Sequence, residues 1–359
     1  MRNLLFIFLG LLLPVIGCSG RSESLSATSQ ADTPSYDTGW HPDILGDDYT
    51  MRYVNQGRDY LGDVRSTIIK LPVHSGCDST RGILYVHGFN DYFLQKDMGE
   101  RFADSCWRFF AVDLRRYGRS LEKGQRLFEV RSMHEYFADI DSGIAEMKRE
   151  GVKEIVVLGH STGGLTTSLY LNYRHDPAIK GLILNSPFLD WNQSKFQEKI
   201  LIPVVSFIGR FWHSLTALPG TDPIYSRPDS LNDEGPWGII RAWKPREWPS
   251  LDAGWIHAIH SGQRELRRDS EGRGGSRIEV PVLLLLSDRS FHKGMAESMR
   301  DSTDDVLDVR DISRYGRELG PDVTEVVIPG GVHDLVRSTP QAREAAYRAI
   351  FNFLDTIPG

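Results

Sequence analysis

Short runs of apolar residues recur along the chain and alternate with segments of helical period. Continuous apolar runs of this length are typical of strands buried on both faces of a parallel sheet. Six segments show the pattern: 81–87, 108–113, 154–160, 180–185, 281–287 and 324–329. Helical periodicity lies between them, at 134–149, 162–173 and 340–354. The alternation predicts an α/β fold with a mostly parallel, doubly wound sheet, and residues 52–71 predict an antiparallel pair at its edge.

One segment interrupts this alternation. Residues 188–277 separate the fourth and fifth predicted strands, and a loop of that length without structure is uncommon in a compact domain. The segment also holds six of the eight tryptophans. We therefore expect a cap or lid at 188–277, inserted between two parts of one core, 46–187 and 278–359. The tryptophans form either the core of this cap or an apolar wall for a substrate.

The first residues differ in character from the rest. Met1 and Arg2 form a positive start, and Leu4 to Ile16 is an apolar run of 13 residues, shorter than a comfortable membrane span. Cys18 and a polar, Ser- and Thr-rich stretch follow. This order predicts a signal peptide at 1–17 and a flexible tether at 18–45.

Composition and charge argue against some classes of protein. The chain has 359 residues, with 42 Lys and Arg against 48 Asp and Glu, and a formal net charge of −6. This acidic balance argues against a nucleic-acid binder, and the 40% hydrophobic content argues against a disordered chain. Beyond Cys18, the chain has only Cys77 and Cys106. An exported protein can join them in a disulfide, or they can remain as two buried thiols.

A nucleophile is indicated by Gly159-His160-Ser161-Thr162-Gly163, which fits the pattern G-x-S-x-G. The motif follows a predicted strand and opens a predicted helix. That setting is typical of a nucleophile elbow, a sharp turn that exposes the serine hydroxyl above a sheet. We therefore expect Ser161 to be a catalytic nucleophile.

A serine of this kind needs a base and an acid. The base is expected after the last strand, where His333 lies in Gly330-Gly331-Val332-His333-Asp334. The acid is expected between the fifth parallel strand and this histidine. We favour Asp304, which precedes His333 by 29 residues, enough for one helix and one strand. Asp288, Asp305 and Asp308 remain alternatives.

The oxyanion of an acyl-transfer intermediate needs N–H donors. The residue after the nucleophile, Thr162, is expected to supply one. The loop His87-Gly88-Phe89 after the first predicted strand is expected to supply the other, from Phe89. His87 and His160 flank this site at strand ends, and we expect them to be structural.

With these residues in hand, the chain resembles the α/β-hydrolase superfamily, and within it the branch of monoacylglycerol lipases, lysophospholipases and serine aminopeptidase-like hydrolases. The loop 113–120 is similar to the "D-x-R-G-x-G-x-S" loop of that branch, with Arg116 and Tyr117 departing from its usual glycine. The run 304–309 resembles its acid motif, displaced by an insertion after Ser287, which supports Asp304. The resemblance covers residues 50–357 and implies a serine ester hydrolase that needs no metal or organic cofactor.

Val15-Ile16-Gly17-Cys18 resembles the lipobox of bacterial lipoproteins. This resemblance implies cleavage before Cys18 and lipidation of it, and Ser19 suggests the outer membrane, facing the periplasm. A plain secretory signal with a chance cysteine is the alternative.

Together these features predict an envelope esterase that cleaves carboxylic esters of lipids through a Ser161–His333–Asp304 triad, as a lysophospholipase or monoacylglycerol lipase would. A serine peptidase acting on small peptides and a non-catalytic binding module on the same fold are the alternatives. A lipid anchor on Cys18 would make the membrane a partner, and no nucleic-acid partner is expected. The sequence leaves the oligomeric state open.

Overall fold

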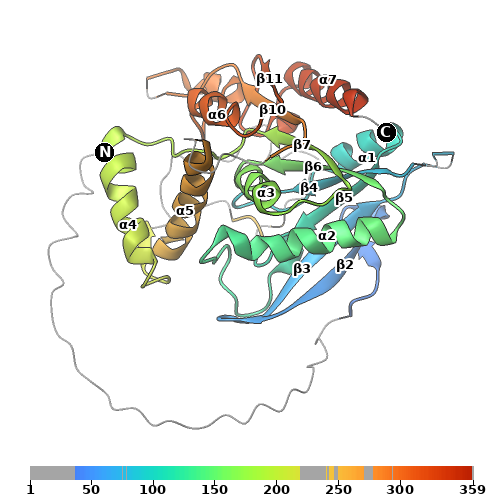
Figure 1. Cartoon of the computed structure of the whole chain (residues 1–359), viewed down its shortest axis with the longest axis horizontal. Helices are drawn as coiled ribbons and strands as arrows, with labels where there is room; N and C mark the ends of the chain where they lie inside the picture. The colour runs from blue at the N-terminus through green and yellow to red at the C-terminus, as the bar shows by residue number, and fades with distance from the viewer. Residues whose placement is uncertain are drawn as a thin grey trace, which may run out of the picture. The chain divides into compact units, whose positions relative to one another are not determined.

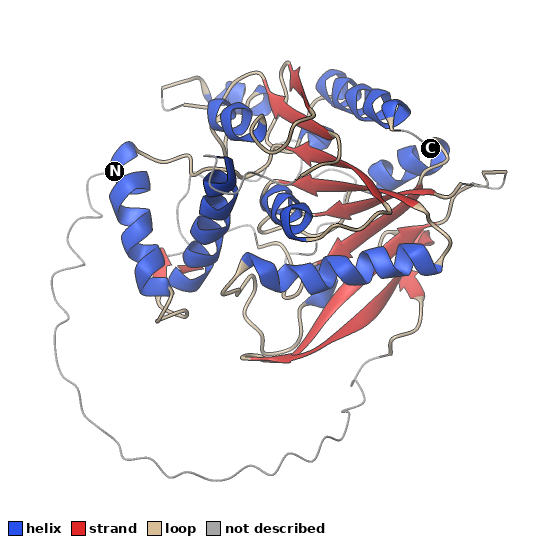
Figure 2. Cartoon of the chain, viewed as in Figure 1, coloured by secondary structure: helices blue, strands red, loops and turns tan. Residues whose placement is uncertain are grey.

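The computed structural model of the chain describes residues 37–74, 76–77, 79–218, 240, 242–245, 250–270, 278–292 and 294–357. The predicted signal peptide and the lipidation site at Cys18 lie outside these residues. Nine described strands form one sheet in the order β1-β2-β3-β5-β4-β6-β7-β10-β11 (Figures 1 and 2). Their bounds are β1 His41–Asp43, β2 Gly46–Asp59, β3 Gly62–Leu71, β4 Arg81–Val86, β5 Arg108–Asp113, β6 Glu154–His160, β7 Ile179–Asn185, β10 Val282–Ser287 and β11 Val323–Ile328.

Six strands of this sheet, β4, β5, β6, β7, β10 and β11, are parallel, and each coincides to within two residues with a predicted strand. β2 and β3 form the antiparallel pair expected from 52–71, and β1, which was not predicted, adds a third antiparallel strand at this edge. Every residue of β10 is buried, which explains why this strand reads as one unbroken apolar run. The order reverses between β4 and β6, so their carboxyl ends flank a topological switch point, where ligands of open α/β sheets bind.

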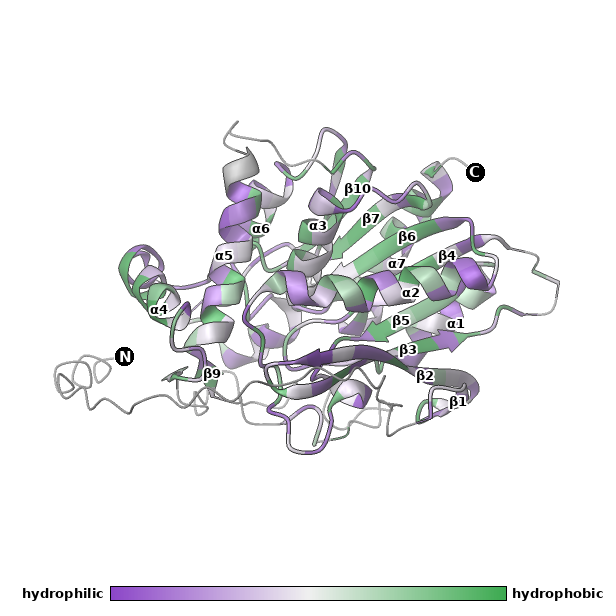
Figure 3. Ribbon diagram, turned by 60° about the horizontal axis from the view of Figure 1, so that its bottom comes forward, coloured by the Kyte–Doolittle hydropathy of each residue, from purple (hydrophilic) through white to green (hydrophobic). Residues whose placement is uncertain are grey.

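Helices cover both faces of the sheet. One face packs against α2 (Phe137–Arg149), α3 (Thr162–Tyr173) and α6 (Val309–Gly316), and the other against α1 (Lys96–Asp104) and α7 (Pro340–Thr356). Colouring by hydropathy shows the green, apolar strands enclosed between these helices (Figure 3). The molecule therefore has two hydrophobic layers on either side of one sheet. Helices α1 and α6 were not predicted.

Between β7 and β10 the chain leaves the sheet, within the segment predicted to be a cap. It forms a π-helical turn (η3, Gln197–Leu201), α4 (Ile202–Gly209), a small two-stranded sheet of β8 (Thr216–Leu218) and β9 (Leu251–Asp252), and α5 (Ala253–Ser270). Helices α4 and α5 lie side by side (Figures 1 and 3), and the Ser206 hydroxyl is 3.1 Å from Nδ1 of His257 between them. Among the described helices, none combines the length and the apolarity that a membrane crossing needs.

The prediction of a flexible tether at 18–45 is wrong for residues 41–43, which form a strand. β1 lies within 18–45, and Asp43 at its end is buried. Its carboxylate accepts hydrogen bonds from Arg119 at 2.6 and 2.8 Å, and Arg119 also donates to Asp113 at 2.9 Å. This long-range ion-pair network fixes the start of the fold, and no local pattern in 37–45 indicates it.

The loop after β5 explains the departure at Arg116. This residue has a φ of +63°, in the left-handed region that favours glycine, which matches the glycine usual at this place in the similar loop. Its buried guanidinium donates to the Glu129 carbonyl at 2.8 Å and pairs with Asp59. The buried contacts of the side chain offset the backbone strain that a glycine would avoid.

Cys77 and Cys106 form a disulfide, with 5.4 Å between their Cα atoms. The bridge joins the segment before β4 to the turn between α1 and β5, and it closes a loop of 29 residues. Of the two alternatives that the sequence left open, the structure therefore contains the disulfide.

Candidate active site

Ser161 lies on a sharp turn between β6 and α3. It is the N-cap residue of α3, with φ +54° and ψ −120°, a conformation that residues other than glycine rarely adopt. Its carbonyl accepts hydrogen bonds from the N–H groups of Gly164 and Phe188, both at 2.9 Å. These bonds hold the strained turn, which raises the hydroxyl above the carboxyl end of the sheet.

Two glycines let the chain pass close to this turn. A Cβ at Gly163 would lie 2.3 Å from the Val86 carbonyl oxygen, so α3 can pack on β4 only without a side chain there. A Cβ at Gly88 would lie 2.9 Å from the Cβ of Ser161. The loop after β4 therefore runs directly against the serine, as the sequence predicted from the G-x-S-x-G pattern and from Gly88.

The structure brings Ser161, His333 and Asp304 together. The Ser161 hydroxyl is 2.9 Å from Nε2 of His333, and Nδ1 of the same ring is 3.0 Å from Oδ2 of Asp304. With Nδ1–H donating to the carboxylate, Nε2 is free to accept the serine proton. Residues 172 positions apart in the sequence thus form one hydrogen-bonded chain.

Asp304 has the surroundings of an orienting acid, and Asp288 does not. Asp304 is fully buried, and its second oxygen accepts the N–H groups of Val306 and Leu307 at 2.9 and 2.8 Å. Asp288 instead pairs with Arg289 and accepts the Gly330 N–H at 2.9 Å. Asp288 therefore caps the end of β10 and braces the turn before the histidine.

The charges around His333 favour its protonated form. Burial, the largest single influence, opposes the positive charge, but the charge and hydrogen bond of Asp304, together with Asp305 and Asp334, outweigh it and raise the pKa of His333 above its usual value. The neighbouring His160 ring lies 5.0 Å away, and burial lowers its pKa. A neutral His160 therefore lies beside a more basic His333.

Polar groups that sequence reasoning missed support the histidine loop. Asn185, the last residue of β7, donates to Asp334 at 2.8 Å and accepts the Leu335 N–H at 3.2 Å. Gln95 donates to the other oxygen of Asp334 at 3.1 Å. These buried bonds tie the residues after His333 to β7 and to the start of α1. The only sequence signal was the position of Asn185 at a strand end and of Asp334 next to the histidine.

His87 and His160 are structural, as expected. Nε2 of His87 accepts the Leu114 N–H at 3.1 Å, and its Nδ1 donates to the Gly88 carbonyl at 2.8 Å. Nδ1 of His160 donates to the Asn185 carbonyl at 3.1 Å. Both rings therefore use their nitrogens to hold backbone around the site.

The residues predicted to donate to an oxyanion are Thr162 and Phe89. Thr162 is the first residue of α3, so its N–H has no acceptor within the helix. Phe89 follows Gly88, the residue that lies against Ser161, and its ring packs 4.6 Å from that of Trp255 in the cap. Both predicted donors thus belong to segments that adjoin Ser161.

A short cap segment contacts the loop that carries Phe89. Lys244 pairs with the buried Asp91 at 2.9 Å, and the carbonyl of Pro245 accepts from the Asn90 side chain at 3.2 Å. Asn90 has a φ of +49°, so the loop is strained directly after Phe89. Burial opposes the negative charge of Asp91, but Lys244 and Arg337 overcome this and lower the pKa of Asp91. We refer to the contacts of Lys244 and Pro245 with residues 90–91 as the cap clamp.

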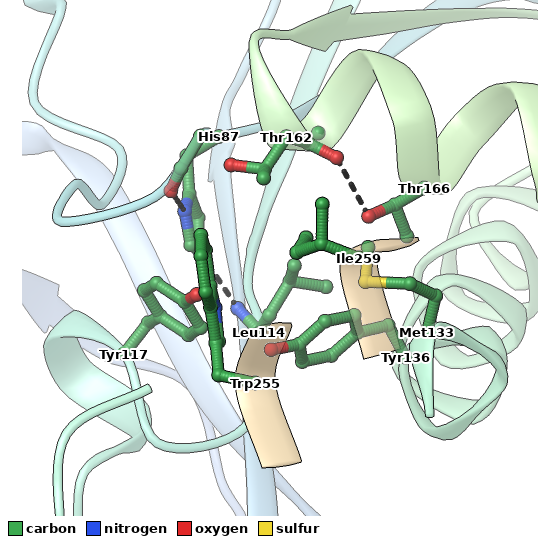
Figure 4. Close-up of a pocket in the computed structure, with 11 residues that line it drawn as sticks. His87, Leu114, Tyr117, Met133, Tyr136, Thr162, Thr166, Trp255 and Ile259 are labelled. Atoms are coloured by element: carbon green, nitrogen blue, oxygen red, sulfur yellow. Dashed lines mark hydrogen bonds between the residues drawn. The ribbon is translucent and has the colours of Figure 1, made fainter. Parts of the chain in front are cut away.

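A small cavity lined by Gly88 and Thr162 has room for about one water molecule. Figure 4 shows it walled by Tyr117, Tyr136 and Trp255. The Thr162 hydroxyl is buried without a hydrogen-bond partner. Of the cap tryptophans, Trp255 is buried in the core and also lines this cavity, whereas Trp212 is 65% exposed and fits neither predicted role. Within the described ranges, no cluster of three His, Cys, Asp or Glu side chains could hold a metal ion.

The sheet order and the sharp turn at Ser161 beside its switch point define an α/β-hydrolase fold. Residues 78–236 match the family described as "Serine aminopeptidase, S33". Among solved structures, the monoglyceride lipase of Saccharomyces cerevisiae is similar, with a TM-score of 0.65 and 17% identity over 91% of this chain and 100% of that chain. The monoacylglycerol lipase of Paleococcus ferrophilus gives a TM-score of 0.57 and 21% identity over 86% and 99%. At these identities the likeness is one of fold.

Two curated proteins are similar over shorter stretches. The probable lysophospholipase BODYGUARD 2 of Arabidopsis thaliana is 31% identical over 110 residues, 29% of this chain and 22% of that protein. Phospholipase YtpA of Bacillus subtilis is 29% identical over 108 residues, 30% of this chain and 40% of that protein. This chain thus spans less than half of the length of either relative.

Proposed function

We propose that the protein is a serine ester hydrolase that cleaves lipid esters, with the specificity of a lysophospholipase or monoacylglycerol lipase. The observation that carries this proposal is the hydrogen-bonded chain from the Ser161 hydroxyl through His333 to Asp304. A serine alcohol is a poor nucleophile unless a base takes its proton, and this geometry supplies the base.

In the proposed reaction, Ser161 Oγ attacks the ester carbonyl while Nε2 of His333 takes its proton. Asp304 holds the ring and stabilises its positive charge. The oxyanion receives hydrogen bonds from the N–H groups of Phe89 and Thr162, each worth about 3 kcal/mol in the transition state. His333 then protonates the leaving alcohol, and a water deprotonated by His333 releases the acid from Ser161.

The apolar side chains beside the proposed oxyanion donors, rather than the size of the small cavity, support an apolar acyl group. Trp255, Tyr117 and Met133 lie there together with Gly88 and Thr162. Burying a chain against such side chains gains about 25 cal/mol per Å². Rates on p-nitrophenyl esters of increasing chain length measure this preference, and an optimum at two carbons would contradict a lipase. Loss of particular species from a total lipid extract identifies the head group.

The nucleophile itself is tested with a fluorophosphonate probe on the full chain. The folded protein should be labelled at Ser161, and the variant Ser161→Ala should not. A folded wild-type protein that resists the probe would favour the non-catalytic binding module. Circular dichroism of both proteins establishes that they are folded.

A serine peptidase acting on small peptides is the second candidate, because the family that matches residues 78–236 is described as serine aminopeptidases. The same triad cleaves amides. Comparing kcat/KM for aminoacyl-naphthylamides with that for p-nitrophenyl esters separates the two, and higher values for the amides would replace the lipase assignment.

We also propose that the protein is a lipoprotein anchored through Cys18 in the outer membrane of a bacterium, facing the periplasm. The apolar run before Cys18 and the polar stretch after it support this location. Mass spectrometry of the protein isolated from membranes should find an acyl-modified Cys18 at the amino terminus.

A further inference from the structure

The outer face of the cap exposes large apolar side chains. We define the cap face by the following residues: Phe196, Ile200, Val204, Phe207, Phe211, Trp212 and Leu215. Their exposed fractions run from 47 to 65%. The described part of the chain has ten exposed large hydrophobic side chains, and seven of them are in this one segment. Scattered exposed residues need no explanation, but a cluster of this kind marks an interaction site.

The spacing places the first four of these side chains along one side of the helical segment η3–α4, and the last three follow Gly209, where α4 ends. Steps of three and four residues, from Phe196 through Ile200 and onward, keep side chains on the same face of a helix. The other side of α4, with Ile202 and Val205, is buried in the core cluster that also contains α5. The helix is thus apolar on both sides, and such helices are normally covered all round.

The charges around the cap face indicate what covers it. Lys195, Lys199 and Arg210 are exposed beside it, and Glu198 is the one carboxylate in residues 194–215, so the local net charge is +2. The whole chain has a net charge of −6. The Arg210 guanidinium lies 5.8 Å from the Phe211 ring. An apolar helix face with aromatic residues and flanking basic residues fits the surface of an anionic bilayer, because long basic side chains reach the head groups.

We propose that the cap face docks on an anionic phospholipid bilayer, with η3–α4 lying in the plane of the head groups. A second copy of this chain fits less well, because pairing two cap faces would bring together like charges. The docked helix packs on α5, whose Trp255 contacts Phe89 beside Ser161. Docking would therefore hold the candidate active site close to the lipid. Docking of the cap face on lipid does not require the proposed hydrolysis.

Trp212, which belongs to the cap face, provides a fluorescent probe of its contact with a bilayer. The full chain carrying Ser161→Ala is mixed with vesicles of phosphatidylcholine and phosphatidylglycerol that contain brominated acyl chains, which quench tryptophans inserted in the bilayer. The same protein with Trp212→Phe keeps an aromatic side chain but lacks this emission. We expect the vesicles to quench a component that only the Trp212 protein has, and equal quenching of the two proteins would overturn the proposal.

Vesicle flotation of matched variants tests the surface as a whole. Phe207→Ser with Phe211→Ser should weaken binding by ~10-fold or more, and Lys195→Glu with Lys199→Glu should weaken it by ~10-fold or more on anionic vesicles only. The control, Ile44→Ser with Val327→Ser, removes side chains exposed at 52 and 46% elsewhere and should bind normally. Residues 1–36 are identical in all variants, so any difference reports on the cap.

Sedimentation equilibrium and the emission of Trp212 test whether a second copy of the chain or another segment of it covers the cap face instead of a bilayer. A dimer that Phe207→Ser with Phe211→Ser converts to monomers, without quenching of Trp212, would assign the cap face to a second copy. An emission of Trp212 that is blue-shifted without vesicles and unchanged by them would assign it to another segment of this chain. Either result would overturn bilayer docking, whereas labelling of Ser161 by a fluorophosphonate would still stand as a separate result.

Discussion

Asp304 divides its two carboxylate oxygens between His333 and the backbone. Oδ2 lies 3.0 Å from Nδ1 of the histidine, and Oδ1 accepts the N–H groups of Val306 and Leu307. A fully buried carboxylate held in this way has a fixed rotamer, with one oxygen directed at Nδ1 of the imidazole. It can therefore select the tautomer in which Nε2 faces Ser161.

The first prediction compares Asp304 with Asp288. Asp304→Asn should lower kcat by about 10³- to 10⁴-fold, because an amide at this place no longer stabilises the imidazolium. Asp288→Asn should cost less than ~10-fold, because Asp288 contacts Arg289 and the Gly330 N–H rather than the ring. Steady-state hydrolysis of a soluble ester measures both, and equal mild losses would remove Asp304 from the proposed role.

The second prediction uses the strained backbone of Ser161. Both Ser161→Ala and Ser161→Gly should lower kcat by about 10⁴-fold or more, because both lack the nucleophile. Only glycine relieves the φ of +54°, so Ser161→Gly should be more stable than Ser161→Ala by ~1–2 kcal/mol. Urea denaturation of the two variants measures this difference, and equal midpoints would contradict a strained elbow.

The third prediction concerns pH. His333 must be neutral to accept the serine proton, and its pKa is raised in the fold. The acid limb of kcat/KM should therefore have its midpoint above pH 6.5, the ordinary pKa of histidine. Asp304→Asn removes the charge that contributes most to raising the pKa of His333. The acid limb of the remaining activity should therefore move to lower pH.

The same raised pKa has a consequence for stability. The charged ring is favoured more in the folded than in the unfolded protein, so this contribution is fully present below about pH 6.5. It is lost as pH rises through the higher, folded pKa of His333. Proton NMR titration of the His333 ring gives the folded value directly, and a value below 6.5 would contradict both statements.

The fourth prediction concerns the cap clamp. Lys244→Met removes the partner of the buried Asp91 and frees the strained loop after Phe89. Misplacing an oxyanion donor affects the transition state more than substrate binding, so kcat should fall by about 10- to 100-fold with a smaller change in KM. Lys244→Arg keeps the charge and should retain most of the kcat of the unmodified protein. A loss confined to KM would show that the clamp acts on substrate binding alone.

The fifth prediction concerns the disulfide. The bridge between Cys77 and Cys106 closes a loop of 29 residues, which corresponds to ~3–4 kcal/mol of chain entropy in the unfolded state. Cys77→Ala with Cys106→Ala should lower the free energy of unfolding by about this amount and leave the ester hydrolysis of the folded protein intact. Denaturation curves with and without reductant provide the check in the unmodified chain.

The sequence by itself determined the elements whose signals are local. The apolar runs that became β4, β5, β6, β7, β10 and β11 are consecutive residues buried on both faces, so their pattern needs no knowledge of neighbours. The turn at Ser161 could also be predicted from the sequence, because its glycines, the preceding strand and the following helix are adjacent in the chain. The candidate base His333 followed from its order relative to these elements, and so did a set of candidate acids in which Asp304 was favoured over Asp288, Asp305 and Asp308.

Only the tertiary structure decided which distant groups meet. It placed Asp304 rather than Asp288 on the ring of His333, joined Cys77 to Cys106, and brought Lys244 of the cap onto Asp91. It also extended the fold back to Asp43, in the segment expected to be a tether, and left one apolar side of α4 uncovered. Sequence separation does not fix distance in space, and whether an apolar or charged side chain is buried depends on the elements that pack over it.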